Sequence, residues 1–222
     1  MADPRPYSVL VRDEDHEIEI KRSRFICYLA RVESETDARE QVELVRAEHR
    51  LARHHCTAFV IGPERELRRS NDDGEPSGTA GMPMLDALVK HVPEGREAPD
   101  LSDVVAVVVR YFGGVLLGAG GLVRAYSEAV SATLARASFA TRARLALFTL
   151  EAPVAEAGRW EHELRAAGIE VVDTTYDTSA HLRLAIDDTE AARAALDGRI
   201  ATITSGAARA VAEGTEWRTT RG

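Results

Sequence analysis

One segment of the chain, from Asp103 to Ala137, constrains the fold more than any other. Residues 104–109 are apolar and mostly β-branched, which predicts a buried strand. Glycines then crowd the next stretch of sequence. From Leu122 onward, apolar residues recur at helical spacing. The segment therefore predicts a strand, a glycine-rich loop and a helix in that order.

The composition of the glycine-rich loop allows two interpretations. Glycine permits positive φ and lets a ligand approach the bare backbone, and the N-terminus of a helix has unpaired N–H groups that attract anions. Arg110 and Arg124 flank the loop and would add positive charge. The alternative is a tight connection that serves packing alone. The glycines concerned are Gly113, Gly114, Gly118, Gly120 and Gly121.

The spacing of these glycines differs from that of nucleotide-binding loops. No Gly-Lys-Ser/Thr follows them, as a P-loop requires, and Gly-x-Gly-x-x-Gly does not stand directly between strand and helix. The sequence also shows no nucleophile pattern or catalytic triad. We therefore expect no cofactor and no enzymatic activity, with an enzyme acting on a small phosphorylated ligand as the alternative. We also expect Gly118, Gly120 and Gly121 to adopt backbone conformations that alanine tolerates poorly.

Length and composition predict a soluble globular protein of one large or two small domains. The chain has 222 residues, of which 45% are hydrophobic. It contains no apolar run long enough to span a bilayer, and its first residues lack a signal-peptide pattern, so we expect a cytoplasmic protein without membrane contact. Cys27 and Cys56 match neither a zinc pattern nor a disulfide framework, and we expect both to be buried core residues.

The net charge of the chain limits how it could bind nucleic acid. The sequence has 28 Lys and Arg against 36 Asp and Glu, a formal net charge of −8, which argues against a broad nucleic-acid-coating surface. Residues 101–150 are locally basic, because their only acidic residues are Asp103 and Glu128. A confined anion site is therefore compatible with the composition. The arginines of this region are Arg110, Arg124, Arg136, Arg142 and Arg144.

A basic cluster interrupts the strand pattern near the N-terminus. Residues 17–21 alternate between polar and apolar, as in a half-buried strand, and residues 25–32 resume a strand. The cluster between them is either a solvated turn or a set of donors for an anion. It consists of Lys21, Arg22, Ser23 and Arg24.

Two adjacent histidines follow the first predicted helix. Residues 34–51 predict an amphipathic helix, and residues 57–61 predict an apolar strand. His54 and His55 precede that strand, where neighbouring side chains point to opposite faces. They are therefore poor joint ligands for one metal ion, and we expect one to be packed and the other to face a groove.

A loop dense in turn-forming residues spans residues 70–83. Its carboxylates could in principle hold a hard cation, but their spacing does not match an EF-hand loop. We therefore expect no metal site and favour a structured turn whose carboxylates accept backbone N–H groups. Residues 84–92 then predict a helix with Pro83 in its first turn. The loop residues of interest are Asp72, Asp73, Gly74, Glu75, Ser77, Gly78 and Thr79.

A new pattern of elements begins near Arg142. The predicted order is β-α-β-β-α-β, which is the order of the ferredoxin-like split unit. We therefore expect two domains joined between Ala140 and Arg144. The predicted strands are residues 145–150, 169–176, 181–186 and 211–218, and the predicted helices are residues 155–167 and 189–196.

Three blocks of the sequence resemble the IMPACT/YigZ family. The first block is residues 21–25, the second is residues 72–83, and the third is residues 110–126 with the glycine-rich loop. His54-x-Cys56 before a strand also fits the family pattern. The resemblance covers almost the whole chain.

This resemblance implies an α+β protein of two domains. Residues 1–140 would form an IMPACT N-terminal domain with the ribosomal protein S5 domain 2-like fold, which also occurs in translation factors and small-molecule kinases. Residues 141–222 would form a ferredoxin-like βαββαβ domain similar to a domain of elongation factor G.

The resemblance also implies a function connected with translation. Eukaryotic members of the family act in translational control, and bacterial members are linked to nucleic-acid or ribosome binding. We therefore expect a non-enzymatic regulator whose partner is RNA, the ribosome or a protein of the translation machinery; a plain interaction module is a further alternative. The loop at residues 72–79 would line the binding cleft. The expected binding residues are Lys21, Arg22, Ser23, Arg24, His54, Arg110, Gly113, Gly114, Gly118, Gly120, Gly121 and Arg124.

Overall fold

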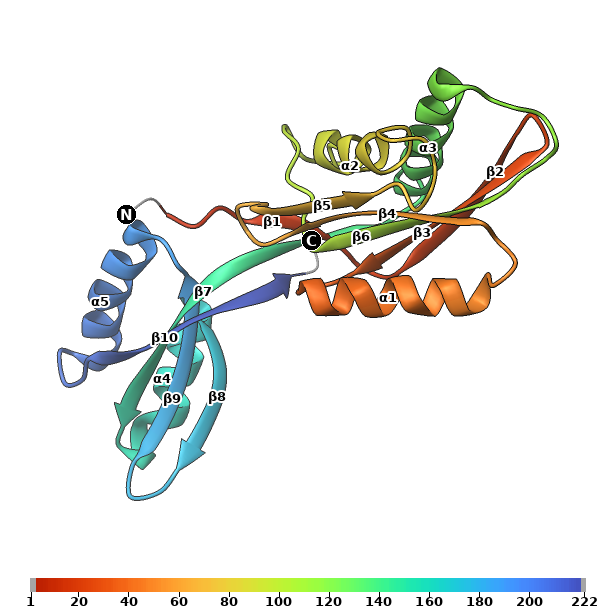
Figure 1. The fold of residues 1–222 in the computed structure, drawn as a ribbon. Helices are drawn as coiled ribbons and strands as arrows, with labels where there is room; N and C mark the ends of the chain where they lie inside the picture. The colour runs from red at the N-terminus through yellow and green to blue at the C-terminus, as the bar shows by residue number, and fades with distance from the viewer. Residues whose placement is uncertain (1–2, 221–222) are drawn as a thin grey trace. The chain divides into compact units, whose positions relative to one another are not determined.

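The computed structural model describes residues 3–220, which form two compact units (Figure 1). The N-terminal unit holds residues 7–141, and the C-terminal unit holds residues 142–220 together with the chain up to Pro6. The outer limits expected for the two domains, residues 1 and 222, lie outside the described residues. Within residues 3–220, no helix is both long enough and apolar enough to span a membrane.

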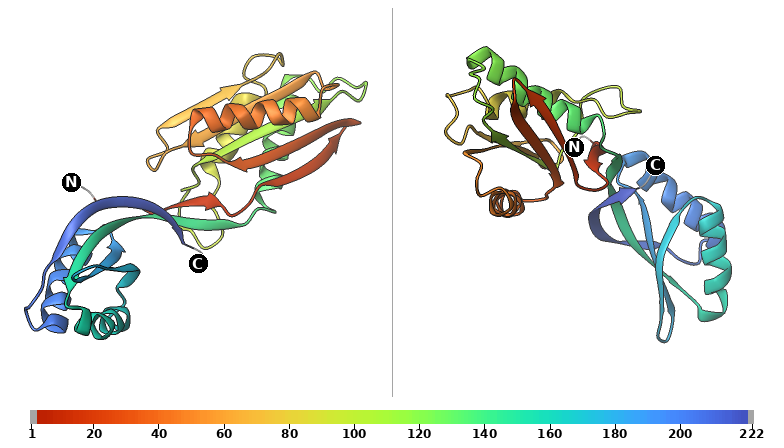
Figure 2. Two further views of the ribbon diagram at one scale, coloured as in Figure 1. Left: turned by 90° about the horizontal axis from the view of Figure 1, so that it is seen from below. Right: turned by 90° about the vertical axis from the view of Figure 1, so that its right-hand side faces the viewer.

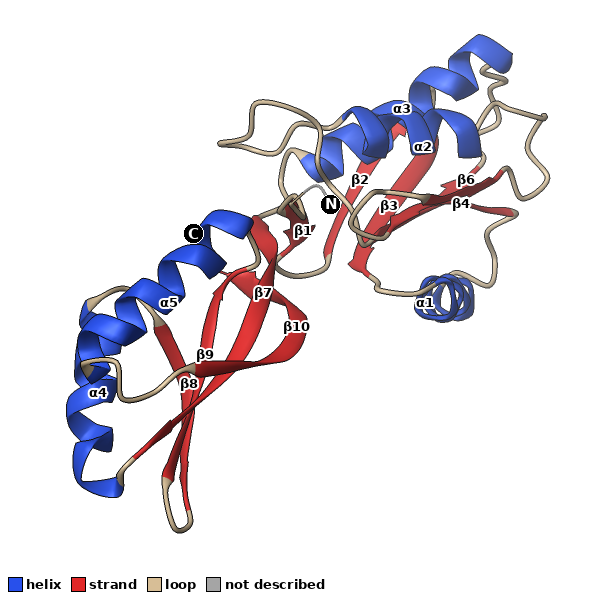
Figure 3. Ribbon diagram, turned by 90° about the vertical axis from the view of Figure 1, so that its left-hand side faces the viewer, coloured by secondary structure: helices blue, strands red, loops and turns tan. Residues whose placement is uncertain are grey.

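A five-stranded antiparallel sheet forms the centre of the N-terminal unit, with its strands in the order β2-β3-β6-β4-β5. Helix α1 covers one face of this sheet, and helices α2 and α3 cover the other (Figures 2 and 3). The strands are β2 (Glu14–Ile20), β3 (Ser23–Arg31), β4 (His54–Ile61), β5 (Leu67–Asn71) and β6 (Val104–Tyr111). The helices are α1 (Glu35–Glu48), α2 (Gly81–Lys90) and α3 (Ala119–Leu134).

Strand β6 is buried on both faces, because it is the central strand of a sheet that lies between two layers of helices. The side chains of residues 104, 106 and 108 pack with α2 and α3, whereas those of residues 105, 107 and 109 pack on the side of α1. Burial of one valine side chain stabilises a fold by about 1.5–3 kcal/mol. The buried strand predicted from the apolar run is confirmed.

A short N-terminal strand, β1 (Tyr7–Leu10), joins the sheet of β7 (Phe139–Ala152) rather than the sheet of β2. Asp103, which directly precedes β6, holds β1 in place. The buried Asp103 carboxylate accepts hydrogen bonds from the Tyr7 hydroxyl at 2.7 Å and from the Gly62 backbone N–H at 3.0 Å. Asp103 therefore ties β1 and the chain after β4 to the central strand.

The C-terminal unit has the element order β-α-β-β-α-β, as the sequence predicts. Strands β10, β7, β9 and β8 lie side by side in that order, and helices α4 and α5 cover one face of them (Figure 3). Trp160 and Leu164 of α4 and Ile200 of α5 pack in its apolar core. The remaining elements are α4 (Val154–Ala166), β8 (Glu170–Tyr176), β9 (Ala180–Asp187), α5 (Glu190–Thr204) and β10 (Ala210–Thr220).

Several element boundaries differ from the prediction. Helix α3 begins at Ala119 rather than at Leu122, so two glycines expected in the loop lie in its first turn. The helix predicted to end at residue 196 continues to Thr204, because Ile200 and Ile203 pack into the core. Strand β5 precedes the predicted turn-rich loop and includes its first two residues, 70 and 71, and it pairs with β4.

A shortened chain of residues 7–141 should fold by itself. Both apolar cores of the N-terminal unit, one on each face of its sheet, consist entirely of residues within these limits. Circular dichroism should therefore show a single cooperative thermal transition. A matched chain of residues 12–141 lacks the buried Tyr7 and Leu10 and should melt at a lower temperature. Gradual melting of the 7–141 chain would contradict the expectation.

Candidate functional site

The segments expected to form a cleft meet at one end of the N-terminal sheet, which we call the glycine end. The strand registers show this, because Arg110 at the end of β6 pairs with His54 at the start of β4 and with Phe25 near the start of β3. The β2–β3 turn, the loop after β5 and the loop after β6 all lie at this end. The glycine end comprises residues 21–25, 54–56, 72–81 and 110–124.

The basic β2–β3 turn lies directly against the glycine-rich loop. Lys21 and Arg22 form its two central positions, with φ of 49° and 65°, and both residues are exposed. Positive φ at both central positions is the geometry of a type I′ hairpin turn. A Cβ atom added to Gly113 would lie 2.0 Å from the carbonyl carbon of Arg22. The Gly113 N–H also donates to the Ser23 hydroxyl at 3.1 Å, so the turn and the loop are held in contact.

Arg24 is already paired within the β2–β3 hairpin. Its Nε and Nη2 atoms donate to the two carboxylate oxygens of Glu17, each at 2.7 Å. This hydrogen bonding holds the pKa of the Glu17 carboxyl below its usual value. The guanidinium also lies over the Tyr111 ring, 5.4 Å from its centroid. The charge of Arg24 is therefore balanced by Glu17 at the protein surface.

Arg110 forms a buried ion pair with Glu75, a residue of the loop after β5. Its Nη1 atom donates to Glu75 Oε1 at 2.7 Å, and the Tyr126 hydroxyl of α3 donates to the same oxygen at 2.7 Å. Burial, and then the neighbouring Cys56 and Glu75, raise the pKa of Tyr126, which keeps this hydroxyl protonated as a donor. The charge of Arg110 is therefore balanced by Glu75 within the core.

Asp72 serves as the missing N-terminal cap of α2. The N-cap residue Ala80 has no side-chain acceptor, and Asp72 Oδ1 accepts from the N–H groups of Ala80 at 3.0 Å and Gly81 at 2.8 Å. Asp72 Oδ2 accepts from the Gly78 N–H at 2.7 Å. Burial disfavours the charged carboxylate, but the three backbone N–H donors outweigh it, so the pKa of Asp72 lies below its usual value.

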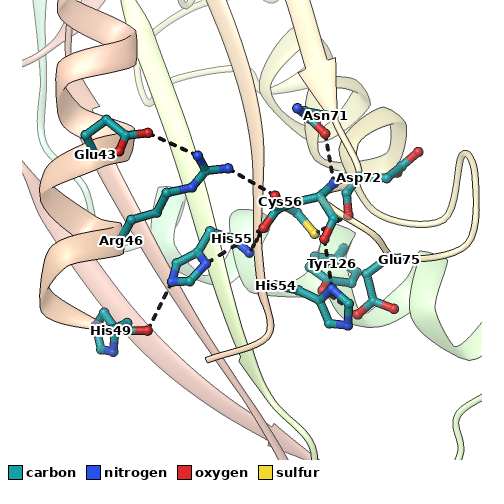
Figure 4. Close-up of polar contacts among 11 residues, drawn as sticks. Glu43, Arg46, His49, His54, His55, Cys56, Asn71, Asp72, Glu75 and Tyr126 are labelled. Carbon is teal, nitrogen blue, oxygen red and sulfur yellow. Dashed lines mark hydrogen bonds and ion pairs between the residues drawn. The ribbon is translucent and has the colours of Figure 1, made fainter. Parts of the chain in front are cut away.

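Asp73 links the same loop to α1 and β4. Its Oδ1 atom accepts from Arg46 Nη2 at 3.0 Å, and its Oδ2 atom accepts from the His55 backbone N–H at 2.6 Å. His54 Nδ1 lies 2.8 Å from the Asp73 carbonyl oxygen, so this nitrogen carries the proton and donates it. Figure 4 shows Arg46 reaching from α1, and His54 and His55 from β4, toward this segment. His54 is therefore engaged with the loop.

The rest of the loop is a structured turn, as the sequence predicts. Gly74 and Gly78 have positive φ, of 85° and 74°, and the Thr79 hydroxyl donates to the Pro76 carbonyl at 2.6 Å. Ser77 is exposed. Among the described residues, no group of three or more His, Cys, Asp and Glu side chains is arranged to hold a metal ion.

Helix α3 begins at the glycine end without a side-chain cap. Its N-cap is Gly118, with φ of 72°, and the glycines after it belong to the helix. Positive φ was expected at Gly118, Gly120 and Gly121, and this is wrong for the last two, which lie in the helical first turn. Gly114 has a φ of 84°. Arg124 lies on the exposed side of α3, and within residues 3–220 no ion pair joins it to Glu128.

Sequence reasoning missed four residues that build this end of the sheet. Phe112 covers the Arg110 guanidinium, Tyr126 shares Glu75 with it, and Arg46 binds Asp73. Cys56 was expected only as core, but its Sγ donates to the Asp72 carbonyl at 3.0 Å, and burial raises its pKa to about 12. The contacts of Tyr126, Arg46 and Cys56 join residues far apart in sequence, for which a single sequence contains no signal. Phe112 lies only two residues from Arg110, but the strand pattern does not show that its ring would contact the guanidinium.

Gly113→Ala should destabilise the protein by about 1–3 kcal/mol, because the new methyl group would overlap the Arg22 backbone. Gly120→Ala is the matched control: it lies in α3, and an added Cβ would have no heavy atom within 4 Å. This control should be neutral or stabilising by up to about 1 kcal/mol. Urea unfolding of both variants measures the difference, and equal stabilities would contradict the close contact.

Asp72→Asn should cost about 1–2 kcal/mol, because the amide cannot replace both oxygens and the charge at the α2 cap. The folded pKa of Asp72 is lowered, so its stabilisation is complete above the unfolded pKa of about 3.9 and is lost as the pH falls through the folded pKa. The stability gap between the two proteins should therefore close on acidification. Asp86→Asn, which changes an exposed carboxylate of the same helix, is the control.

Comparison with known proteins agrees with the resemblance seen in the sequence blocks. The family model for the Impact N-terminal domain matches residues 21–134. The chain is 40% identical over 176 residues to the IMPACT family member YvyE of Bacillus subtilis (strain 168), spanning 79% of this chain and 77% of that protein. It is 39% identical over 170 residues to the IMPACT family member YigZ of Escherichia coli (strain K12), spanning 76% and 79% of the two chains.

A solved crystal structure of a hypothetical protein has the same fold over nearly its whole length. It is 34% identical in sequence, with a TM-score of 0.60, and the match covers 94% of this chain and 97% of that one. The matched family model, the two bacterial relatives and this structure lead to one conclusion: the chain belongs to the IMPACT family.

Proposed function

We propose that this protein is a non-enzymatic, translation-associated regulator that binds RNA, free or in the ribosome, through the glycine end of its N-terminal unit. The phosphate contacts come from Lys21, Arg22 and Arg124 and from the uncapped start of α3. These three cations are exposed at the glycine end. Arg24 and Arg110, whose charges Glu17 and Glu75 balance, are not assigned to the phosphate.

The conformation of the β2–β3 turn carries this proposal. A left-handed backbone costs roughly 1–2 kcal/mol for a residue other than glycine, asparagine or aspartate. Type I′ turns accordingly favour Asn-Gly, yet Lys21 and Arg22 occupy both central positions here. Their side chains are exposed, so packing does not compensate for the cost. Because no side-chain packing offsets this backbone strain, it supports a functional reason for having two cations at these positions.

The start of α3 supports binding of a phosphate beside this turn. The equivalent N–H groups of α2 are satisfied by Asp72, whereas the N-cap of α3 is a glycine without a side-chain acceptor. A helix N-terminus favours a nearby anion by about 0.3–1 kcal/mol. The Gly113 contact places the Lys21-Arg22 turn against the loop that leads into α3. The proposal therefore assigns the phosphate to the cations of the turn and to the backbone donors at the start of α3.

The non-enzymatic part of the proposal draws support from the buried reactive groups at this end. Burial raises the pKa of the Cys56 thiol to about 12, so it is a poor nucleophile near neutral pH. Tyr126 and Glu75 are both buried and hydrogen-bonded to each other. Turnover of a small phosphorylated compound by the purified protein would favour the enzymatic alternative instead.

We also propose the specific folds that the family resemblance implies. The N-terminal unit would have the ribosomal protein S5 domain 2-like fold. The C-terminal unit would be ferredoxin-like, similar to a domain of elongation factor G. The order of its elements and the β10-β7-β9-β8 strand order support the second assignment. Both folds occur among translation proteins, which agrees with a cytoplasmic protein that contacts the translation machinery.

RNA binding should be weak and strongly dependent on salt, because the chain as a whole is acidic. For single strands, the slope of log K against log salt concentration falls by about 0.7 for each phosphate neutralised. The double substitution Lys21→Asn and Arg22→Gly should therefore make the slope less negative by about 0.7 for each cation that contacts phosphate. The same substitution should raise thermal stability, because Asn-Gly suits the type I′ turn. Fluorescence anisotropy with a labelled RNA and thermal melting measure the two effects.

The control removes two exposed cations from the opposite end of the same sheet. Arg68 and Arg69 of β5 pair with Val60 and Phe59, far along β4 from His54. Arg68→Ala with Arg69→Ala makes the same change in net charge and should leave the salt slope unchanged. Equal losses of RNA affinity in the two double variants, or wild-type affinity in the turn variant, would overturn the proposed site.

A further inference from the structure

We propose that Phe112 is a stacking platform for an unpaired base, so that the RNA bound at the glycine end is single-stranded. This inference rests on the proposed function and names the class of RNA. Phe112 is not among the residues proposed to contact the phosphate. Phe112 follows β6 directly and precedes Gly113, the residue in contact with the Lys21-Arg22 turn.

Phe112 presents a large apolar ring to solvent. The residue is 54% exposed, although it directly follows β6, in which every residue except Tyr111 is buried. Phe25, on the paired strand β3, is 0% exposed. An exposed aromatic side chain beside exposed cations is the combination that single-stranded nucleic-acid sites use, because the ring stacks on a base while the cations hold the backbone.

The Phe112 ring is backed by a rigid cation. The Arg110 guanidinium lies 5.7 Å from the centroid of the Phe112 ring and 5.5 Å from that of Phe25. The Arg110 side chain is only 9% exposed and is fixed by its ion pair with Glu75. The cation interacts with the electron-rich face of the aromatic ring. Phe112 is therefore held in place from the protein side while its remaining surface stays open.

The support behind Phe112 continues into the core. Phe25 packs edge-to-face against Tyr126, with ring centroids 5.2 Å apart, and Tyr126 shares the Glu75 oxygen with Arg110. Tyr126, Phe25, Arg110 and Phe112 thus form a continuous series of contacts from α3 to the surface. Because the platform is ordered before a ligand arrives, stacking a base on it requires little further ordering of the protein.

A stacking platform distinguishes single strands from duplexes. Bases in a duplex are stacked on each other, so an aromatic side chain reaches them only in single strands, loops and ends. Loss of one base-stacking aromatic side chain typically weakens binding by about 5- to 150-fold. Heparin carries negative charge but no bases, so its binding should depend on the cations alone.

The experiment measures binding of a labelled oligouridylate, an RNA duplex of the same length and heparin to the full chain. Phe112→Leu keeps apolar cover over Arg110 but removes the ring, and it should weaken oligouridylate binding at least 5-fold. Duplex and heparin binding should stay within twofold of wild type. Phe112→Trp should retain binding, and its additional tryptophan emission should be quenched by oligouridylate. Leu116→Ala, in the same loop at 82% exposure, is the control and should have no effect.

The outcomes separate this inference from the proposed function. If Phe112→Leu leaves oligouridylate binding unchanged, or weakens all three ligands equally, the platform is overturned, whereas salt-dependent binding through Lys21 and Arg22 still stands. If the wild-type protein binds neither RNA nor heparin, the proposed function fails as well. Thermal melting of each variant shows whether a loss of binding comes from a loss of folded protein.

Discussion

The buried contact among Arg110, Glu75 and Tyr126 is the interaction on which the glycine end depends. One carboxylate oxygen accepts hydrogen bonds from both other side chains, so the loop after β5, the end of β6 and helix α3 are fixed to one another. Replacing a buried ion pair with apolar residues is often harmless to stability, whereas removing one partner costs about 3–5 kcal/mol. The contact therefore matters chiefly for the geometry that it imposes, including the position of the Phe112 ring.

An acidic protein can hold an anion only if its own carboxylates are kept away from the ligand. At the glycine end this condition is met by internal bonding. Asp72 is committed to three backbone N–H groups, Asp73 to Arg46, and Glu75 to a buried arginine. These three carboxylates of the glycine end thus have partners within the protein, while Lys21 and Arg22 face the solvent. The formal net charge of −8 therefore says little about the local field there.

The sequence was sufficient for the parts of the structure that follow a local pattern. The apolar run at residues 104–109 predicts the central strand, and the restart of strand and helix signals near Arg142 predicts the order of the C-terminal elements. The start of α3 was misplaced, because glycine is a poor helix former and the pattern contains no cap signal other than Gly118. Contacts such as Arg110 with Glu75 depend on how distant segments meet, and periodicity contains no information about that. The resemblance to the family located the relevant segments but not their partners.

The strained Lys21-Arg22 turn has a consequence for how this chain can diverge over evolutionary time. Were the turn kept only for its shape, neutral drift among descendants would carry it toward Asn-Gly, which relieves the left-handed strain at no loss. If the two charges are needed for binding, selection removes such substitutions, and the chain keeps a turn that is less stable than Asn-Gly would be. The residues found at these two positions across diverged relatives thus form a record of which pressure has acted.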